Sequence, residues 1–497
     1  MIHSVISYLQ SSAERFPERM AVSDCDKSWT YHQLWKTVST MGSAIYTKTG
    51  GIKKPIVVLI KHDLSDIVAF YSIAFSGNFY IPVDVSLPAE RIKKMLDIVR
   101  PAAIICSHHD VIPLPTDVPI WTHDDLLSEL SPISSPWKTC KDTDLLYIMF
   151  TSGSTGEPKG VAISHSSVID MVEQFTAAFD FAEGTVFGNQ APFDFDVSVK
   201  DIFLSAKVAG TLVILEKKLF SVPKHLINRL NDYKVDTLIW AVPALNIIAK
   251  LNAFKTDAPR FLKNVMFSGE IMPLKTLQYW MDMLPETRFV NLYGPTEITC
   301  NCTYYVVTDP KKLSDAVPIG IPFDNCSVFL LDNDHLVQED GLIGEICVTG
   351  TCLAMGYYRW LGLTQSVFQQ NPLNQEYPER MYRTGDLGCY NNGQLIFMGR
   401  KDSQIKHMGH RIEITEIILC ANTMDGVESS SCIYDKDASK IILFYQGVVP
   451  EKNLYDYLRS KLPRYMLPGL LKRLDAFPKT RTGKIDNKVL MQMLKGE

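Results

Sequence analysis

The sequence lacks a long hydrophobic run. No stretch reaches the roughly 18 uninterrupted apolar residues that a membrane-spanning helix needs. The first ten residues also lack the basic flank and the long apolar centre of a secretory signal. Neither a membrane-spanning nor a secreted protein is expected from this pattern, and we predict a cytoplasmic location.

Paired cysteines are missing as well. The eleven cysteines are spread from Cys25 to Cys432, and none forms a CxxC pair. Cys300 and Cys302 are two positions apart, without histidines at ligand spacing. A disulfide framework or a zinc site is therefore not expected, and most of these thiols should be small buried residues.

The chain also has no excess of basic residues. Its net charge is −5, and basic and aromatic residues do not interleave as they would in a nucleic-acid groove. Nucleic acid is therefore not an expected partner. From Arg400 to the end, 17 Lys and Arg stand against 12 Asp and Glu, a net charge of +5, so the remainder carries −10. This asymmetry predicts a separate C-terminal unit with its own partner surface.

With 497 residues the chain is too long for one ordinary core. Short apolar runs at Pro55–Ile60, Ala102–Cys106 and Asp236–Trp240 alternate with amphipathic stretches such as Leu64–Ser76. This alternation is typical of parallel sheets covered by helices. Strand-like runs become more frequent toward the C-terminus, and a polar turn at residues 399–402 predicts a boundary between domains 1–400 and 401–497.

A loop rich in Ser, Thr and Gly follows a strand-like run that ends at Phe150. Glycines in such a loop let main-chain N–H groups approach phosphate oxygens, hydroxyls add donors, and Lys159 adds positive charge. The spacing is not the GxxxxGK[ST] of a P-loop, which disfavours a Walker-type NTPase. The alternative interpretation is a flexible turn without a ligand.

Three further clusters carry candidate chemistry. Asn291–Glu297 combines a tight Tyr-Gly-Pro turn with a hydroxyl and a carboxylate, which could hold Mg²⁺ near a phosphate or simply be solvated. Tyr382–Asp386 places an acid after a glycine, suited to accepting hydrogen bonds from ribose hydroxyls. Lys479–Asp486, near the C-terminus, is by composition alone a solvated basic loop.

Together and in this order, the four clusters resemble the adenylate-forming superfamily, which includes acyl-CoA synthetases, luciferases and adenylation domains of nonribosomal peptide synthetases. The likeness runs from Leu9 to Leu490, and the segments 81–92 and 399–414 are similar to the amino-acid-activating branch. One departure is Ile418, where the family has a Glu without a catalytic role. The resemblance implies an α/β fold: a large N-terminal portion of α/β subdomains with a β-rich subdomain, plus a small mobile C-terminal α/β domain.

The resemblance also implies roles for individual residues. Lys484 and Glu297 would be catalytic, Lys484 by bridging the attacking carboxylate and the α-phosphate and Glu297 as the ligand of Mg²⁺. Asp402 would be the hinge about which the small domain turns. Residues implied to bind ATP are Thr151, Ser152, Gly153, Ser154, Thr155, Gly156 and Lys159 at the phosphates, Asn291 and Tyr293 at the adenine, Asp386 and Arg400 at the ribose, and also Gly294 and Thr296.

Asp196 and Lys200 are the candidate substrate-reading residues. By resemblance, Asp196 binds the α-ammonium group of an amino acid; the alternative is an aspartate that merely caps a helix. Lys200 lies one helical turn later and would line the pocket, where a cation is costly unless it is paired. A side-chain carboxylate on the substrate would pair it, which makes glutamate the lead substrate. Alternatively Lys200 pairs with Asp196 at i,i+4, and the substrate is small, as in D-alanine–carrier protein ligases.

The predicted function is therefore ATP-dependent activation of an amino acid and its transfer to a thiol. No Gly-Gly-x-Ser carrier segment is present, so the acceptor would be a separate, acidic phosphopantetheine carrier protein attracted by the basic C-terminal part. The alternatives are an acyl- or aryl-CoA synthetase, which Asp196 disfavours, and a non-catalytic nucleotide-binding protein, which would have lost the catalytic groups. The other candidate pocket residues are Val197, Ser268, Leu292, Cys300 and Asn301.

Overall fold

The computed structural model describes residues 2–107, 117–129, 134–153, 157–255, 257–313, 316–401, 404–435, 438–478, 485 and 487–495. It divides into two compact units. Unit 1 comprises Met1–Val85, Val99–Met149 and Gly160–Lys401, and unit 2 comprises Ser86–Ile98, Phe150–Lys159 and Asp402–Glu497. Unit 2 therefore takes in two short segments from the earlier part of the sequence.

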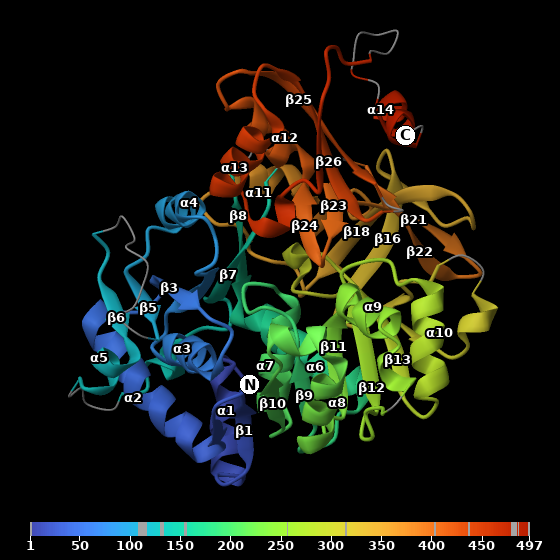
Figure 1. The fold of residues 1–497 in the computed structure, drawn as a ribbon. Coiled ribbons are helices and arrows are strands. Elements are labelled where there is room, and N and C mark those ends of the chain that lie inside the picture. Colours follow the sequence, from blue (N-terminus) through green and yellow to red (C-terminus); the bar gives the residue numbers. More distant parts are fainter. Residues whose placement is uncertain are drawn as a thin grey trace. The chain divides into compact units, whose positions relative to one another are not determined.

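The first sheet of unit 1 is mostly parallel. Its strands follow the order β19-β8-β7-β4-β3-β5-β6, and β3 pairs in parallel with both β4 and β5 (Figure 1). Each of the short apolar runs predicted from the sequence is a strand here or in the next sheet. The strands are β3 (Pro55–Ile60), β4 (Phe79–Asp84), β5 (Ala103–Cys106), β6 (Ile120–Thr122), β7 (Leu145–Thr151), β8 (Lys159–Ser164) and β19 (Gly356–Tyr357).

The second sheet of unit 1 has parallel strands at its centre and antiparallel strands at its edges. Its order is β15-β14-β13-β12-β11-β9-β10-β1-β2. The strands are β1 (Met20–Ser23), β2 (Ser28–Thr30), β9 (Val186–Asn189), β10 (Thr211–Ile214), β11 (Thr237–Ala241), β12 (Asn264–Ser268), β13 (Arg288–Tyr293), β14 (Thr303–Val307) and β15 (Ile321–Pro322).

The third sheet is antiparallel and forms the β-rich part of unit 1. It runs β17-β16-β18-β21-β20, and β22 pairs with β21. Its strands are β16 (Cys326–Asp332), β17 (His335–Val337), β18 (Ile343–Gly350), β20 (Phe368–Gln370), β21 (Arg380–Asn391) and β22 (Gln394–Arg400).

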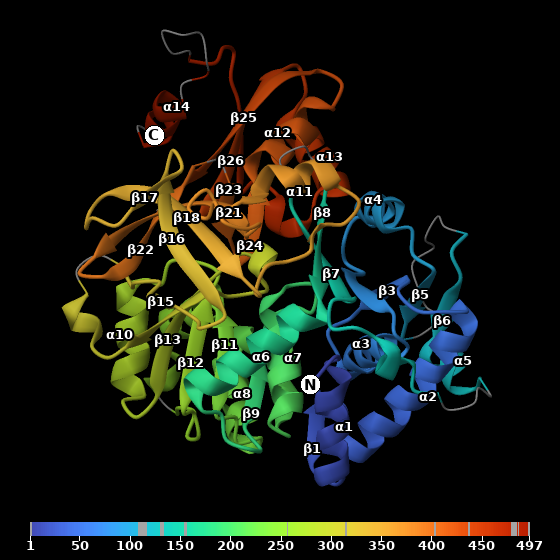
Figure 2. The ribbon, with the colours of Figure 1, turned by 180° about the vertical axis from the view of Figure 1, so that it is seen from behind.

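Helices cover the two mixed sheets of unit 1 on both faces (Figures 1 and 2). The α-helices are α1 (Ile6–Arg15), α2 (Tyr31–Thr49), α3 (Leu64–Phe75), α5 (His123–Leu127), α6 (His165–Phe179), α7 (Val197–Lys207), α8 (Pro223–Asp232), α9 (Val242–Lys250), α10 (Leu274–Met283) and α11 (Leu361–Val367). The 3₁₀ turns are η1 (Pro136–Thr139), η2 (Lys217–Ser221), η3 (Ala253–Lys255), η4 (Thr296–Ile298) and η5 (Pro310–Lys312).

Unit 2 has a core of its own, in which Ile417 of α12, Leu443 of β26 and Leu458 of α13 are buried together. Its strands form a hairpin, β23-β24, and a separate sheet, β25-β26-β27. The elements are α4 (Ala89–Val99, ending at the unit boundary), β23 (Gln404–His407), β24 (His410–Glu413), α12 (Ile414–Asn422), β25 (Val427–Asp435), β26 (Lys440–Gly447), α13 (Glu451–Lys461), η6 (Arg464–Met466), β27 (Leu470–Arg473) and α14 (Asn487–Lys495). The predicted α/β fold class with a β-rich subdomain is confirmed, whereas the mobility of the small domain stays a prediction.

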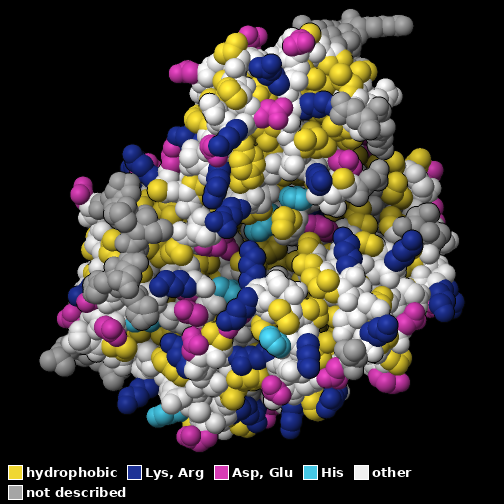
Figure 3. All heavy atoms as spheres, viewed as in Figure 1, with side chains coloured by type: hydrophobic (Ala, Val, Ile, Leu, Met, Phe, Trp, Pro, Cys, Tyr) yellow, Lys and Arg dark blue, Asp and Glu magenta, His cyan; other side chains and the backbone are white. Residues whose placement is uncertain are grey.

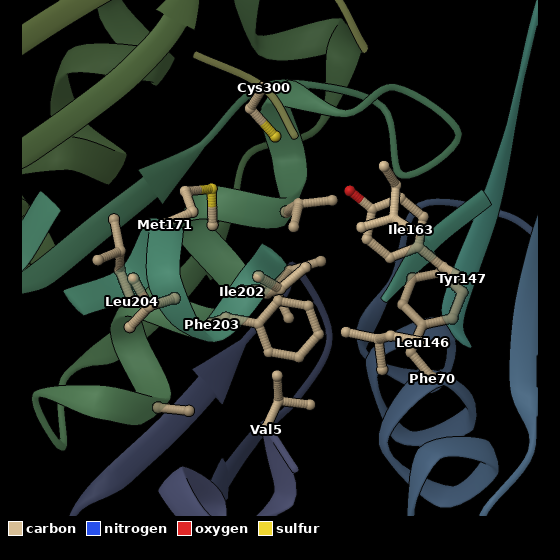
Figure 4. Packing of buried hydrophobic residues seen from close by; sticks show 14 of the residues in the cluster. Val5, Phe70, Leu146, Tyr147, Ile163, Met171, Ile202, Phe203, Leu204 and Cys300 are labelled. Carbon is tan, nitrogen blue, oxygen red and sulfur yellow. The ribbon is translucent and has the colours of Figure 1, made fainter. Parts of the chain in front are cut away.

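The central strands of the second sheet are buried on both faces. On β12, Met266 faces one hydrophobic core while its neighbours Val265 and Phe267 face another. The first of these cores includes Phe203 of α7, Phe70 of α3 and Tyr147 of β7 in the first sheet (Figure 4). Since strands without a solvent-facing side read as continuous apolar runs, this burial explains why the runs were visible in the sequence.

Helix α7 is enclosed by protein along almost its whole length. Every residue from Val197 to Ala206 is buried. The last carbonyls of a helix have no partner within the helix, and here side chains of other helices supply donors. The Ser12 hydroxyl donates to Ala206 O at 2.6 Å and the Tyr31 hydroxyl to Ser205 O at 3.0 Å. The position of α7 is therefore fixed from both α1 and α2.

The surface shows charge of both signs. On the face drawn in Figure 3, Lys and Arg side chains lie among Asp and Glu rather than in one basic stripe. Most of the cysteines are buried, as predicted. In the described part of the chain, no helix combines the length and the apolar character that crossing a bilayer requires.

Tyr31→Phe tests the anchoring of α7. The hydroxyl also donates to Gly210 O at 2.8 Å, so its removal takes a donor from buried carbonyls. We expect the free energy of unfolding to fall by about 1–3 kcal/mol, measured by chemical denaturation. Tyr46→Phe on the same helix, where the ring is 37% exposed, is the control and should change stability little. Equal effects of the two substitutions would contradict the anchoring role.

Candidate active site

Three predicted nucleotide-binding residues of unit 1 meet in one buried cluster. Asp386 on β21 lies opposite Arg400 on β22 in the antiparallel register. Arg400 Nη1 donates to Asp386 Oδ1, and the Tyr293 hydroxyl donates to Asp386 Oδ2 at 2.6 Å. Burial and the adjacent Asp386 carboxylate raise the pKa of Tyr293 well above its usual value, so the hydroxyl stays protonated and remains a donor. The cluster joins the end of β13 to the antiparallel sheet.

Asn291, two residues before Tyr293 on β13, is held by the main chain. Its Nδ2 donates to Pro318 O at 2.7 Å. The amide oxygen, Oδ1, takes no part in that bond and is the atom that could accept the amino N–H of an adenine. The hydrogen bond therefore orients the side chain in the way that the predicted role requires.

The turn after β13 brings Glu297 into the protein interior. Gly294 must be a glycine, because a Cβ there would lie 2.6 Å from Asn301 Cα. Thr296 is half-buried and begins η4, which carries the fully buried Glu297. The Tyr357 hydroxyl donates to Glu297 Oε1 at 2.7 Å. Tyr357 was not a predicted site residue, since no motif in the sequence singles it out.

The chemistry of Glu297 fits a cation ligand. A carboxylate buried at 0% exposure is costly without a charge or hydrogen bonds to compensate it, and a hard divalent cation prefers oxygen ligands. The Tyr357 hydroxyl holds this carboxylate in place, and a Mg²⁺ bound by Glu297 would compensate its charge. Among the described residues, Glu297 is the candidate ligand for Mg²⁺.

Asp196 and Lys200 lie at the beginning of α7, and both are buried. Asp196 occupies the N-cap position, but its side chain makes no capping hydrogen bond. The interpretation of Asp196 as a simple helix cap is therefore wrong. The Cys300 thiol donates to the Asp196 carbonyl oxygen at 3.1 Å, which connects the start of α7 to the segment after η4.

Lys200 is fully buried, and its ammonium group is hydrogen-bonded to the segment that follows η4. Nζ donates to Asn301 Oδ1 at 2.7 Å. Asp196, the partner within the chain that the sequence suggested as an alternative, is not the acceptor in this bond. Asp201 follows on the helix, and burial raises the pKa of its carboxyl to about 8, so this group holds its proton at neutral pH.

The other predicted pocket residues are placed on neighbouring elements. Val197 begins α7, Ser268 ends β12 and Leu292 lies on β13, all buried. Hydrogen bonds thus link Asp196 to Cys300 and Lys200 to Asn301, while Val197 lies on α7 and Ser268 and Leu292 lie on neighbouring strands. What the sequence did not reveal is that Asn301 is the acceptor for Lys200.

The predicted phosphate-binding residues that the structure describes lie in unit 2. Thr151 ends β7, Ser152 and Gly153 follow it, and Lys159 begins β8. Ser154, Thr155 and Gly156 lie outside the described residues, as do the predicted hinge Asp402 and the predicted catalytic Lys484. Their roles stay predictions.

Comparison with solved structures shows the fold. An NRPS protein containing adenylation and PCP domains matches with a TM-score of 0.88 and 24% identity, covering 99% of this chain and 84% of the other. The adenylation domain AlmE of Vibrio cholerae, solved with glycyl-adenosine-5′-phosphate, matches with a TM-score of 0.85 and 21% identity, covering 100% and 98%.

Sequence comparison shows the family. Residues 9–358 match the family described as AMP-binding enzyme. The D-alanine–D-alanyl carrier protein ligase of Bacillus velezensis is 31% identical, over 97% of this chain and 98% of that protein. The protein of the same name from Bacillus cytotoxicus is 29% identical, over 98% and 99%. The chain belongs to the AMP-binding enzyme family and is an AMP-forming ligase.

Proposed function

We propose that this enzyme activates an amino acid as its aminoacyl-AMP and transfers the aminoacyl group to the phosphopantetheine thiol of a separate carrier protein. The observation that carries the amino-acid assignment is Asp196, a buried carboxylate at the head of α7 that does not cap its helix. A substrate α-ammonium group is the ligand that such a carboxylate would neutralise. The names of the carrier protein ligases that match over nearly the whole chain support the same reaction.

In the first step, a substrate carboxylate oxygen attacks the α-phosphorus of ATP and pyrophosphate leaves. Asn291 would accept a hydrogen bond from the adenine amino group, and Tyr293 would pack against the adenine ring. Asp386, held by Arg400, would accept the ribose hydroxyls. Lys159 and the loop that contains Gly153 would bind the phosphates.

Charge builds on the α-phosphate as the new bond forms. Lys484 would bridge the attacking carboxylate and this phosphate, and it stabilises the transition state by fixed positive charge. A Mg²⁺ held by Glu297 would neutralise phosphate charge when bound. In the second step the carrier thiol attacks the acyl carbon, and AMP leaves, after a rotation about Asp402.

The carrier would be an acidic protein. The residues from Arg400 onward carry a net charge of +5, against −5 for the whole chain. Complementary charge speeds encounter and selects partners, so a negatively charged carrier is the partner that this part of the chain would attract.

For the substrate we propose a small neutral amino acid, with D-alanine first. Lys200 already has an acceptor in Asn301, so its hydrogen bonding does not require a substrate carboxylate. The names of the relatives point to the same amino acid. Glutamate stays the second candidate, because the acceptor of the buried ammonium is a neutral amide and a substrate carboxylate would neutralise its charge.

The Asp386 cluster gives a first test. Asp386→Asn removes the negative charge that would accept the ribose hydroxyls. A hydrogen bond to a charged group contributes about 1.5–3 kcal/mol, so we expect ATP binding to weaken by about 10- to 100-fold, measured by titration calorimetry. Asp334→Asn is the control, because Asp334 is an exposed acid that pairs with Arg383 in the same sheet. An unchanged ATP affinity would remove Asp386 from the nucleotide site.

The role of Lys484 gives a second test. Lys484→Ala should lower the rate of amino-acid-dependent ATP–pyrophosphate exchange by about 10³-fold, since its charge acts chiefly in the transition state. ATP affinity should stay near that of the wild type. Lys452→Ala on α13 is the control for loss of one positive charge. Wild-type exchange rates in the Lys484 variant would show that this residue is not catalytic.

The substrate pocket gives a third test, in the exchange assay with both alanine enantiomers, glycine, glutamate and glutamine. Asp196→Ala should lower activation of every amino acid by about 10²- to 10³-fold, because the α-ammonium would be buried without its partner. Lys200→Met should lower the activation rate of every amino acid by a similar factor and leave their order of preference unchanged. Lys207→Met, at the other end of α7, is the matched control.

The wild type could instead prefer glutamate, and this preference could be lost in Lys200→Met. That result would favour glutamate over alanine as the substrate. Activation of aryl or fatty acids but no amino acid would instead contradict the proposed reaction itself.

A further inference from the structure

Four charged side chains of unit 2 form a buried cluster, and the proposed reaction gives a role to only one of them, Lys159. Arg91 of α4 pairs with Glu416 of α12, and Lys159 Nζ lies 3.5 Å from Glu413 Oε1. The four side chains are between 2% and 9% exposed. Charges buried to this degree are stable only with their partners in place.

The loop that contains Ser152 and Gly153 also contacts residues 411–416 through its main chain and a hydroxyl. Gly153 N–H donates to Glu416 Oε2 at 3.3 Å. The Ser152 hydroxyl donates to Arg411 O at 2.7 Å and accepts from Glu413 N–H at 3.1 Å. An ammonium, a main-chain N–H and a hydroxyl of the loop are therefore all engaged by residues 411–416.

These three kinds of group are the ones that bind phosphate oxygens in nucleotide loops. Carboxylate oxygens are acceptors of the same charge, so Glu413 and Glu416 take places that phosphate oxygens would take. We propose that residues 411–416 act as an internal competitor of the ATP phosphates. Occupation of the loop by this segment and occupation by ATP then exclude each other. The inference rests on the proposed role of the loop.

The exclusion acts in both directions, because ATP displaces residues 411–416 from the loop and these residues displace ATP. Burial raises the pKa of Glu416, and the neighbouring Arg91 opposes that shift. When ATP takes Lys159 and Gly153, Glu413 loses the ammonium that compensates its buried charge. An unpaired buried carboxylate is strongly unfavourable, so the segment leaves the loop. Departure of the nucleotide lets the segment return.

The double variant Glu413→Gln/Glu416→Gln tests the competition directly. Without the two negative charges the segment holds the loop less well, and a larger fraction of the protein is competent for ATP. We expect the Kd for ATP to fall by about tenfold, measured by titration calorimetry without amino acid. Glu451→Gln, an exposed acid of α13 in the same unit, is the control and should leave the Kd unchanged.

An unchanged or higher Kd in the double variant overturns the inference. Absence of ATP binding by the wild type would instead count against the proposed function, so the two failures are distinguishable.

Cross-linking gives a measurement that does not depend on these two glutamates. Lys461 and Glu90 form an ion pair within unit 2, and both are partly exposed. In a Cys25→Ser background, which removes the exposed cysteine, Glu90→Cys/Lys461→Cys should be joined by a short bismaleimide. Saturating ATP should lower the yield several-fold, and protein joined beforehand should bind ATP more weakly. The exclusion would be overturned if ATP left the cross-linking yield unchanged and cross-linking left the ATP affinity unchanged.

Discussion

The position of the active-site groups in unit 1 depends on the parallel pairing of β11, β12 and β13. In this register Ala241 lies beside Ser268 and Phe267 beside Asn291, so the carboxyl ends of the strands reach the same edge. The strands are buried on both faces, and most side chains in their middle are therefore apolar. Polar groups collect where the strands end, which is where open α/β sheets bind ligands.

Buried charge shapes the rest of the site. Asp386 is compensated by a guanidinium and a phenol, Glu297 accepts from Tyr357, and Lys200 donates to a neutral amide. Apart from the Asp386–Arg400 pair on neighbouring strands, these contacts join segments that are distant in the sequence. The groups are thus held in place before any substrate arrives, which reduces the reorganisation that binding and catalysis would require.

The fold class and many of the elements could be predicted from the sequence. Pro55–Ile60 has the bounds of an observed strand, and the other apolar runs match to within a residue or two. Continuous apolar runs survive in the sequence because burial on both faces demands them. The partners of Lys200 and Glu297 could not be predicted, since Asn301 and Tyr357 are brought close only by the packing of whole elements. The local pattern suggested an i,i+4 pair for Lys200, and the hydrogen bond to Asn301 is a tertiary contact instead.

Helix α7 carries the proposed substrate-reading residues at one end and the contacts that fix it in the protein at the other. Its far end is fixed by hydroxyls of Ser12 and Tyr31 that bond to carbonyl oxygens, and these bonds do not depend on which side chains the helix carries. Position 200 lies near the opposite end. During evolution, or in a directed-evolution experiment, this residue can therefore change together with Asn301 while the helix keeps its place. Such an arrangement lets related enzymes acquire new amino-acid preferences through a few paired substitutions, without first having to gain extra stability.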